Sequence, residues 1–292
     1  MEIANLQAFV AIAEHGSFSA AAEKLFLTQP AISKRISQLE QEFGCKLFDR
    51  IGRGIQLTQA GQTLLQRARH LLQEIEDARR AIASLTDTVS GPCVMGTSHH
   101  IALHRLPRYL KHYKELYPQV TLDLKFTDSE SGCRSVESGE LEFAVVTLPL
   151  QIKPPLEAIP LWTDELAIVV AADHPLCAIP NLTVPELLTY DAIMPEKGTF
   201  TWDVILKELN TDPQEIKLGL TSNYLETIKM LVSVGLGWSI LPTSMLKNSG
   251  LIVLSIKNIS LYRTLGLVFH KNKTLSNAAR HFIQLLTSST ID

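Results

Sequence analysis

The first part of the chain places apolar residues with the period of a helix. Apolar side chains recur every three or four positions over residues 3–14, which predicts a helix with one buried face. Gly16 ends this pattern. Ser17 is placed to cap a second, alanine-rich helix over residues 17–25, whose small side chains allow close packing.

A third helix is predicted to begin after Thr28 and to stop at Gly44. Thr28 is a suitable N-cap, and Pro30 stands in the first turn, where a missing N–H costs no hydrogen bond. Glycine at the end of a helix is a common C-terminal signal. One apolar stripe follows the helical period and should face a small core: Ile32, Ile36, Leu39 and Phe43.

Two short apolar segments, 46–50 and 55–58, follow this helix and flank Gly52, Arg53 and Gly54. Glycines on both sides of an arginine favour a tight hairpin with a basic tip. Three helices followed by such a hairpin predict a winged helix-turn-helix over residues 1–58. In this architecture a helix enters the DNA major groove and its exposed residues contact base edges.

A long helix is predicted over residues 58–85, capped by Thr58. Its apolar positions are spaced alternately by four and three residues over three heptads, which is typical of a coiled-coil seam. A helix that packs only on its own domain would show this pattern for a turn or two. We therefore expect dimerisation through Leu64, Ala68, Leu71, Ile75, Ala78, Ile82 and Leu85. We assign residues 59–88 to the dimerisation helix and linker.

From Cys93 onward, short apolar strands alternate with amphipathic helices. This alternation predicts an α/β domain over residues 89–292, with largely parallel sheets and helices on both faces. Two hundred residues of this kind can form one large domain or two lobes.

Composition is typical of a globular protein, since 46% of the residues are hydrophobic and 20% are charged. No apolar run approaches the roughly 18 residues that span a bilayer, and the N-terminal segment lacks the basic region of a signal peptide. These features predict a cytoplasmic protein without a membrane partner. Four widely spaced cysteines fit no zinc pattern and are expected to be free thiols.

The net charge of −3 means that DNA binding must depend on local positive charge. Residues 34–53 carry such a cluster, although Glu40, Glu42 and Asp49 oppose it. Gln29 and Ser33 have the chemistry for base edges, whereas the cations suit phosphates or the minor groove. The predicted contacts to double-stranded promoter DNA are Thr28, Gln29, Pro30, Ser33, Lys34, Arg35, Arg50 and Arg53.

A second site is predicted in the α/β part. Ligands of parallel α/β sheets bind at the carboxyl ends of strands, where the N-termini of helices converge. Hydroxyl groups, free helix N–H groups and one lysine at such positions favour a small anion, such as a carboxylate. The candidates are Thr97, Ser98, His99, His100, Thr127, Asp128, Thr147, Lys197, Thr199, Phe200 and Asn223, with Ser222 beside the last.

The sequence contains none of the common catalytic or nucleotide-binding motifs, so we do not expect an enzyme. No cofactor is expected. No metal site is expected either, because the neighbouring His99 and His100 should point in different directions and have no acidic or cysteine partner nearby in sequence.

The stretch from Leu6 to Gly61 resembles the N-terminal domain of LysR-type transcriptional regulators. The resemblance rests on Ser17-Phe18, on the three alanines at 20–22 and above all on residues 28–33, Thr-Gln-Pro-Ala-Ile-Ser. Later positions agree more loosely, among them Leu106-Pro107, Tyr117-Pro118 and Leu241-Pro242. The resemblance covers the whole chain, but its specific motifs lie in the first third.

This resemblance implies a homotetramer built as a dimer of dimers, contacts with RNA polymerase, and an effector domain similar to periplasmic binding proteins. Lobe I would comprise residues 93–162 and 267–292, and lobe II residues 163–266. An effector bound between the lobes would then change DNA affinity or bending. Two alternatives stay open: a redox-responsive regulator that uses cysteine thiols, and an α/β enzyme or solute-binding protein.

Overall fold

The computed structural model describes residues 1–51, 54–83 and 88–288. The chain forms two compact units, Met1–Ala83 (unit 1) and Ser84–Asp292 (unit 2). The predicted roles of Arg53 and Leu85, and of the Arg50 side chain, lie outside the described residues.

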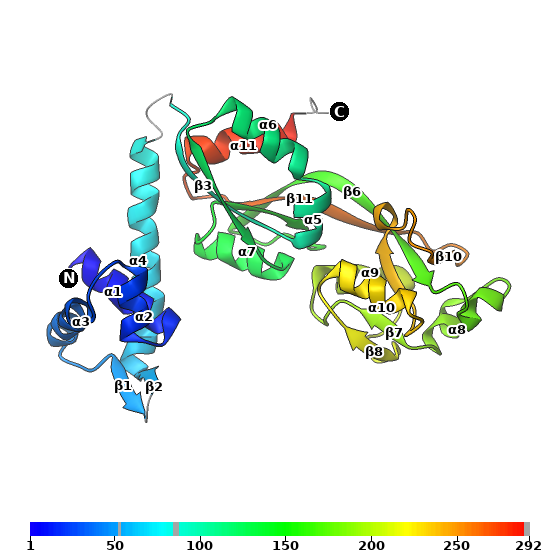
Figure 1. Ribbon diagram of the computed structural model, residues 1–292, viewed down its shortest axis with the longest axis horizontal. Coiled ribbons are helices and arrows are strands. Elements are labelled where there is room, and N and C mark those ends of the chain that lie inside the picture. The colour runs from blue at the N-terminus through cyan, green and yellow to red at the C-terminus, as the bar shows by residue number, and fades with distance from the viewer. Residues whose placement is uncertain (52–53, 84–87, 289–292) are drawn as a thin grey trace. The chain divides into compact units, whose positions relative to one another are not determined.

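Unit 1 is a three-helix domain with a two-stranded wing and a long helix (Figure 1). The side chains of Ser17, Thr28 and Thr58 accept hydrogen bonds from the N–H groups of Ala20, Ala31 and Gly61, so the three predicted N-caps are confirmed. The elements are α1 (Ile3–His15), α2 (Phe18–Lys24), α3 (Gln29–Phe43), β1 (Phe48–Ile51), β2 (Gly54–Leu57) and α4 (Gln59–Ala83).

The two ends of α4 differ in their surroundings. Ala68 is fully buried in the core that α1, α2 and α3 form, and Leu64 packs against the same core. Further along, Leu71 is 41% exposed and Ile82 is 70% exposed. The prediction that Ala68 meets a second subunit is therefore corrected, because its methyl group has no accessible surface outside its own unit.

Unit 2 is built on one sheet of seven described strands and a separate two-stranded sheet. Its elements are β3 (Gly91–Thr97), α5 (His99–His104), α6 (Pro107–Leu116), β4 (Val120–Phe126), α7 (Ser129–Ser138), β5 (Phe143–Thr147), β6 (Leu156–Val170), η1 (Pro175–Ala178), α8 (Val184–Leu188), β7 (Ala192–Met194), α9 (Phe200–Leu209), β8 (Leu218–Thr221), α10 (Leu225–Ser233), β9 (Ser239–Pro242), η2 (Thr243–Met245), β10 (Ile252–Leu254), β11 (Leu261–His270) and α11 (Asn277–Thr287).

The sheets are less parallel than the sequence predicts. Strand β3 pairs in parallel with β4 and β5, and β7 pairs in parallel with β8. The pairs β5–β11, β6–β11, β6–β9 and β6–β10 are all antiparallel. No α-helix separates β5 from β6, or β10 from β11, and antiparallel pairing does not require the crossover helix that parallel pairing needs.

Each lobe has helices on both faces of its strands (Figure 1). In lobe I, Phe143 and Val145 of β5 face a core with α6 and α11, while Ala144 and Val146 face α7. Lobe II repeats this arrangement, with alternate residues of β6 facing α8 and α9 on one side and α10 on the other. This alternation explains why residues 143–146 of β5 and residues 166–170 of β6 are all apolar.

Strands β6 and β11 run side by side from one lobe into the other. Leu265 of β11 already belongs to the core of lobe I, two residues before the boundary expected there. The pairing shifts at Gly266, where a Cβ atom would lie 2.6 Å from the Ile159 carbonyl oxygen. Only glycine allows this close approach of two strands at the passage between the lobes.

Candidate functional site

The first candidate site is the solvent face of α3. Thr28, Gln29, Pro30 and Lys34 are exposed and Ser33 is half-buried. The opposite face of the helix is buried through Ile32, Ile36 and Leu39. This arrangement leaves the polar residues at the N-terminal end of α3 free to approach a DNA groove.

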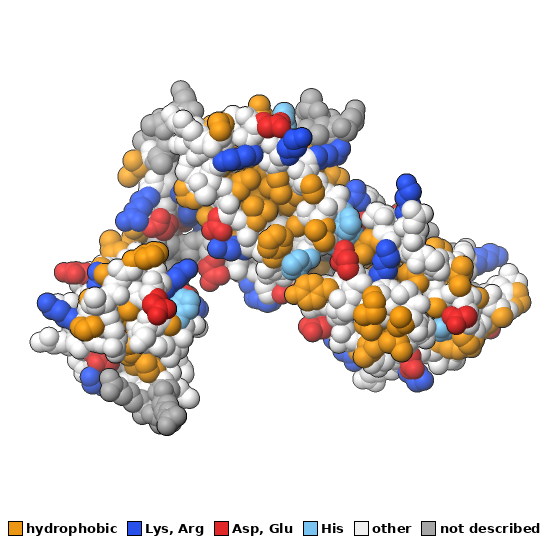
Figure 2. Space-filling model, viewed as in Figure 1, with side chains coloured by type: hydrophobic (Ala, Val, Ile, Leu, Met, Phe, Trp, Pro, Cys, Tyr) orange, Lys and Arg blue, Asp and Glu red, His pale blue; other side chains and the backbone are white. Residues whose placement is uncertain are grey.

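Two of the basic residues near α3 already have partners within unit 1. The Arg35 guanidinium donates to the Ala4 carbonyl oxygen at 3.4 Å, and the Lys46 ammonium lies 2.6 Å from the Glu40 carboxylate. Burial alone would raise the pKa of Glu40, but the hydrogen bonds from Lys46 and from the Leu47 N–H outweigh it and lower the pKa. Figure 2 shows basic and acidic side chains intermixed on the visible face of unit 1.

The second candidate site is a cavity of about 560 Å³ between lobe I and lobe II. This volume lies within the range of small-molecule sites. Eight of the eleven predicted effector residues, together with Ser222, line it. They come from five separate segments: Ser98, His99, His100, Thr127, Asp128, Thr147, Thr199 and Asn223.

Three predicted effector residues do not line the cavity. Thr97 is completely buried at the end of β3, and Lys197 is exposed in the turn before α9. Phe200 packs its ring against the lobe I core that contains α7. The cavity thus lacks the lysine that favoured an anion in the sequence.

Sequence reasoning missed several lining residues. Most of them neighbour predicted ones at the same helix starts and strand ends, so a wider window would have found them. Arg263 is different, because it lies within β11 and no local motif marks it. The missed residues are Phe126, Ser129, Glu130, Pro195, Glu196, Thr201, Thr221, Tyr224, Leu225 and Arg263.

Arg263 belongs to a buried ion-pair network at the base of the cavity. Its Nε and Nη2 atoms donate to one Asp164 carboxylate oxygen at 2.9 and 2.8 Å, and Arg105 binds the other oxygen at 3.1 Å. Arg263 also donates to the Thr201 hydroxyl at 3.1 Å. Asp164 is 1% exposed and Arg263 is 5% exposed. Each charge therefore compensates the other for the loss of water, and neither would be stable there alone.

Glu130 connects the two lobes across the cavity. It lies in the first turn of α7 in lobe I, and its carboxylate accepts a hydrogen bond from the Phe200 N–H at the start of α9 in lobe II. Burial raises the pKa of the Glu130 carboxyl group, against the lowering effect of that hydrogen bond. A carboxylate therefore already occupies the N-terminal end of α9. The N-terminus of a helix carries partial positive charge and so favours an anion.

The other two carboxylates of the cavity are held by nearby polar groups. Asp128 accepts hydrogen bonds from the N–H and the hydroxyl of Ser131. Burial alone would raise the pKa of Asp128, but these bonds keep it below its ordinary value. Glu196 and Asn223 form two mutual hydrogen bonds of 3.0 and 3.1 Å.

All four cysteines are free in the structure. Cys93 and Cys133 are buried, and burial raises the pKa of Cys133 to about 11 and that of Cys93 further. Cys45 and Cys177 are exposed, but they lie in different units. Because the thiolate is the reactive form, the buried pair offers little redox chemistry.

Comparison with known protein families gives two matches that together span most of the chain. Residues 3–62 match the bacterial regulatory helix-turn-helix proteins of the lysR family, and residues 86–290 match the LysR substrate binding domain. The chain belongs to the LysR family. This regulator is a DNA-binding transcription factor with an effector-binding domain and is not an enzyme.

Individual relatives agree with this assignment. A probable RuBisCO transcriptional regulator of Synechocystis sp. is 30% identical over 288 residues, which cover 96% of this chain and 84% of the relative. A full-length OxyR variant from Pseudomonas aeruginosa has a TM-score of 0.69 at 23% identity, covering 98% of this chain and 93% of the other. CbnR in complex with its target DNA has a TM-score of 0.67 at 20% identity, and the match covers 98% of this chain and 99% of CbnR.

The family and the fold confirm the predicted architecture of a helix-turn-helix, a long helix and an α/β effector domain. Within the part of the chain that the structure describes, none of the regulator's helices has the length and apolar character that a membrane crossing requires.

Proposed function

We propose that this regulator binds promoter DNA through α3 and the wing, and that a small effector in the inter-lobe cavity controls this binding. The observation that carries the proposal is the cavity itself, because polar side chains from both lobes line it. A ligand that contacts both lobes can favour one arrangement of the lobes over another.

On α3, we assign base contacts to Gln29 and Ser33 and a phosphate contact to Lys34. Glutamine can form two hydrogen bonds with an adenine edge, whereas lysine acts as a point charge on the backbone. The hydrogen bond to Ala4 leaves Arg35 fewer free donors, so its contribution to DNA binding should be smaller than that of Lys34.

We assign subunit pairing to the C-terminal half of α4. Leu71, Ile75, Ala78 and Ile82 keep the heptad spacing, and Ile82 leaves most of its side chain exposed. Pairing of two such dimers and contact with RNA polymerase complete the proposal. Ile82→Glu should shift sedimentation toward a smaller species, whereas Gln66→Glu, which adds the same charge off the apolar stripe, should not.

For the effector, we propose a small carboxylate that takes the place of Glu130 at the N-terminus of α9. The contact between Glu130 and the Phe200 N–H supports this assignment, because that position already accepts a carboxylate. The raised pKa of Glu130 means that its charged form is held weakly there. Displacing Glu130 would remove one hydrogen bond between the lobes and supply the coupling between effector and lobe geometry.

The experiment is a thermal-shift screen of small carboxylic acids and of amines of similar size. Carboxylates should raise the melting temperature of the regulator, and the rise should be larger in Glu130→Ala, where the competing side chain is absent. Glu137→Ala is the matched control, because Glu137 lies exposed on the same helix.

A rise with amines and none with carboxylates would contradict the anion assignment. It would indicate that Asp128, Glu130 and Glu196 select a cationic effector instead. Equal carboxylate shifts in the parent and in Glu130→Ala would contradict the displacement of Glu130 while leaving the cavity as the effector site.

A further inference from the structure

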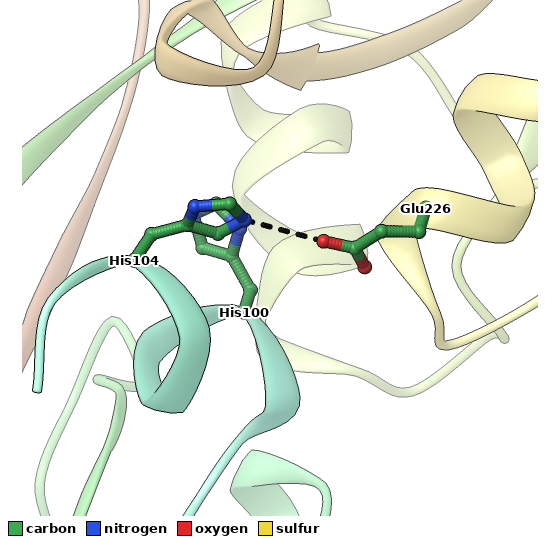
Figure 3. Close-up of side chains that lie close together, drawn as sticks. All are labelled: His100, His104 and Glu226. Atoms are coloured by element: carbon green, nitrogen blue, oxygen red, sulfur yellow. Dashed lines mark hydrogen bonds and ion pairs between the residues drawn. The ribbon is translucent and has the colours of Figure 1, made fainter. Parts of the chain in front are cut away.

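A cluster of two histidines and one glutamate lies at the junction of the two lobes, beside the effector cavity. His100 and His104 are one helical turn apart on α5 of lobe I, and Glu226 lies in the first turn of α10 in lobe II (Figure 3). Their candidate ligand atoms all lie within 4.8 Å of one another. Figure 2 shows pale-blue histidine side chains close to an acidic one where the lobes meet.

His100 is the least usual member of this cluster. It is 5% exposed, and neither of its ring nitrogens has a hydrogen-bond partner. Leaving a buried polar group without a hydrogen bond destabilises the fold, so such groups are rare without a role. Its Nε2 atom lies 3.7 Å from the Asp164 carboxylate, which is too far for a hydrogen bond.

The other two members are accessible and already face each other. The Nε2 atom of His104 lies 3.3 Å from a Glu226 carboxylate oxygen, and both side chains are more than two-fifths exposed. This distance equals about the separation of two ligand atoms on one tetrahedral zinc ion with bonds of about 2.0 Å. The longest separation in the cluster, 4.8 Å, requires an approach of about 1.5 Å, which side-chain rotation can provide.

We propose that His100, His104 and Glu226 form a zinc site that joins the two lobes of the effector domain. Two imidazoles and one carboxylate are a known donor set for Zn²⁺, with the fourth position left for water or another ligand.

The sequence expectation of no metal rested on the neighbours His99 and His100, whereas this cluster joins His100 to residues further along the chain. The His99 ring lies 5.1 Å from both Phe126 and Tyr224 and takes no part in the cluster. The pairing of His100 with His104 follows the helical repeat. The acidic partner lies 122 residues beyond His104 and becomes a neighbour only in the folded domain.

The test uses the full-length regulator after treatment with a chelator. Calorimetric titration with ZnCl₂ should give one equivalent of bound metal, and the affinity should fall at least about tenfold in His104→Gln and in Glu226→Gln. His112→Gln is the matched control, because His112 is 46% exposed and lies 3.9 Å from Glu115 on the same lobe. These exposed positions are chosen so that the buried His100 stays intact and the fold is kept.

Titration with CoCl₂ identifies the ligands. Binding should produce visible absorption of four-coordinate cobalt without the charge-transfer band of a thiolate ligand, which excludes Cys45 and Cys177 as the site. The proposal is overturned if the parent binds less than one equivalent of zinc, if His104→Gln binds as tightly as the parent, or if a thiolate band appears. A loss in His112→Gln equal to that in Glu226→Gln would also overturn it.

Discussion

The exposed face of α3, proposed above to bind DNA, and the inter-lobe cavity are assembled in opposite ways. The residues on α3 lie within one helix, and their exposure follows from the buried stripe on the other side. The cavity draws on side chains from Ser98 to Arg263, which belong to two lobes. Substitutions on α3 should therefore alter binding alone, whereas substitutions at the base of the cavity should also alter folding.

The charged groups of the two sites differ for the same reason. Lys34 is exposed, so its charge stays hydrated and is available to a partner such as the proposed DNA phosphate. Arg263 and Asp164 are almost completely buried, and each stabilises the other against the loss of water. Removing the Lys34 charge leaves a solvated surface. Removing either Arg263 or Asp164 leaves the other as an unpaired buried charge.

The largest effect is expected from Asp164→Asn. The substitution keeps the shape of the side chain but leaves the Arg263 charge uncompensated, which should lower the free energy of unfolding by about 3–5 kcal/mol. Urea denaturation followed by circular dichroism measures this loss. Asp173→Asn, at an exposed position of lobe II, is the control and should change stability by less than about 0.5 kcal/mol. Equal losses of unfolding free energy in the two variants would contradict the idea that burial of the ion-pair network causes the destabilisation.

An intermediate effect is expected on α3, where two exposed residues should separate specificity from affinity. Gln29→Ala should reduce discrimination at one base position by about 1–3 kcal/mol with little change in salt dependence. Lys34→Ala should weaken binding to all sequences and lower the salt slope by about one. Fluorescence anisotropy on DNA fragments selected from a random pool, at several salt concentrations, measures both quantities. Equal changes in base discrimination and in salt slope for the two variants would contradict the assignment of Gln29 to a base and Lys34 to a phosphate.

The smallest effect is expected from Glu130→Gln, through pH. The pKa of Glu130 is raised above its ordinary value of 4.5, so the folded protein binds more protons than the unfolded chain just above pH 4.5. The stability that this group contributes is thus complete below pH 4.5 and is lost as the pH rises through the raised pKa. Glutamine keeps the acceptor for the Phe200 N–H and removes the titration.

The stability of Glu130→Gln relative to the parent should therefore improve as the pH rises from 4.5 toward neutrality. Urea denaturation at a series of pH values measures this difference. Glu137→Gln, on the exposed side of α7, should follow the parent at every pH. A constant difference between Glu130→Gln and the parent would indicate that Glu130 titrates alike in the folded and unfolded chains.

Local patterns in the sequence determined the elements of unit 1. The capping of α2 and α3 by Ser17 and Thr28 depends on contacts within three residues, so it could be predicted without tertiary information. The alternation of strands and helices likewise predicted an α/β effector domain. The strand ends and helix starts indicated nine of the nineteen residues that line the cavity, Ser222 included, because ligands gather at such points in α/β sheets.

Only the tertiary structure decided the features that depend on distant contacts. Burial of Ala68 in the core of unit 1 separates the two halves of α4, although the heptad pattern runs through both. The antiparallel course of β6 and β11 places Arg263 beside Asp164, and no local signal marks either residue. The cluster of His100, His104 and Glu226 has the same origin, because the folding of two lobes onto shared strands brings together side chains that lie far apart in the chain.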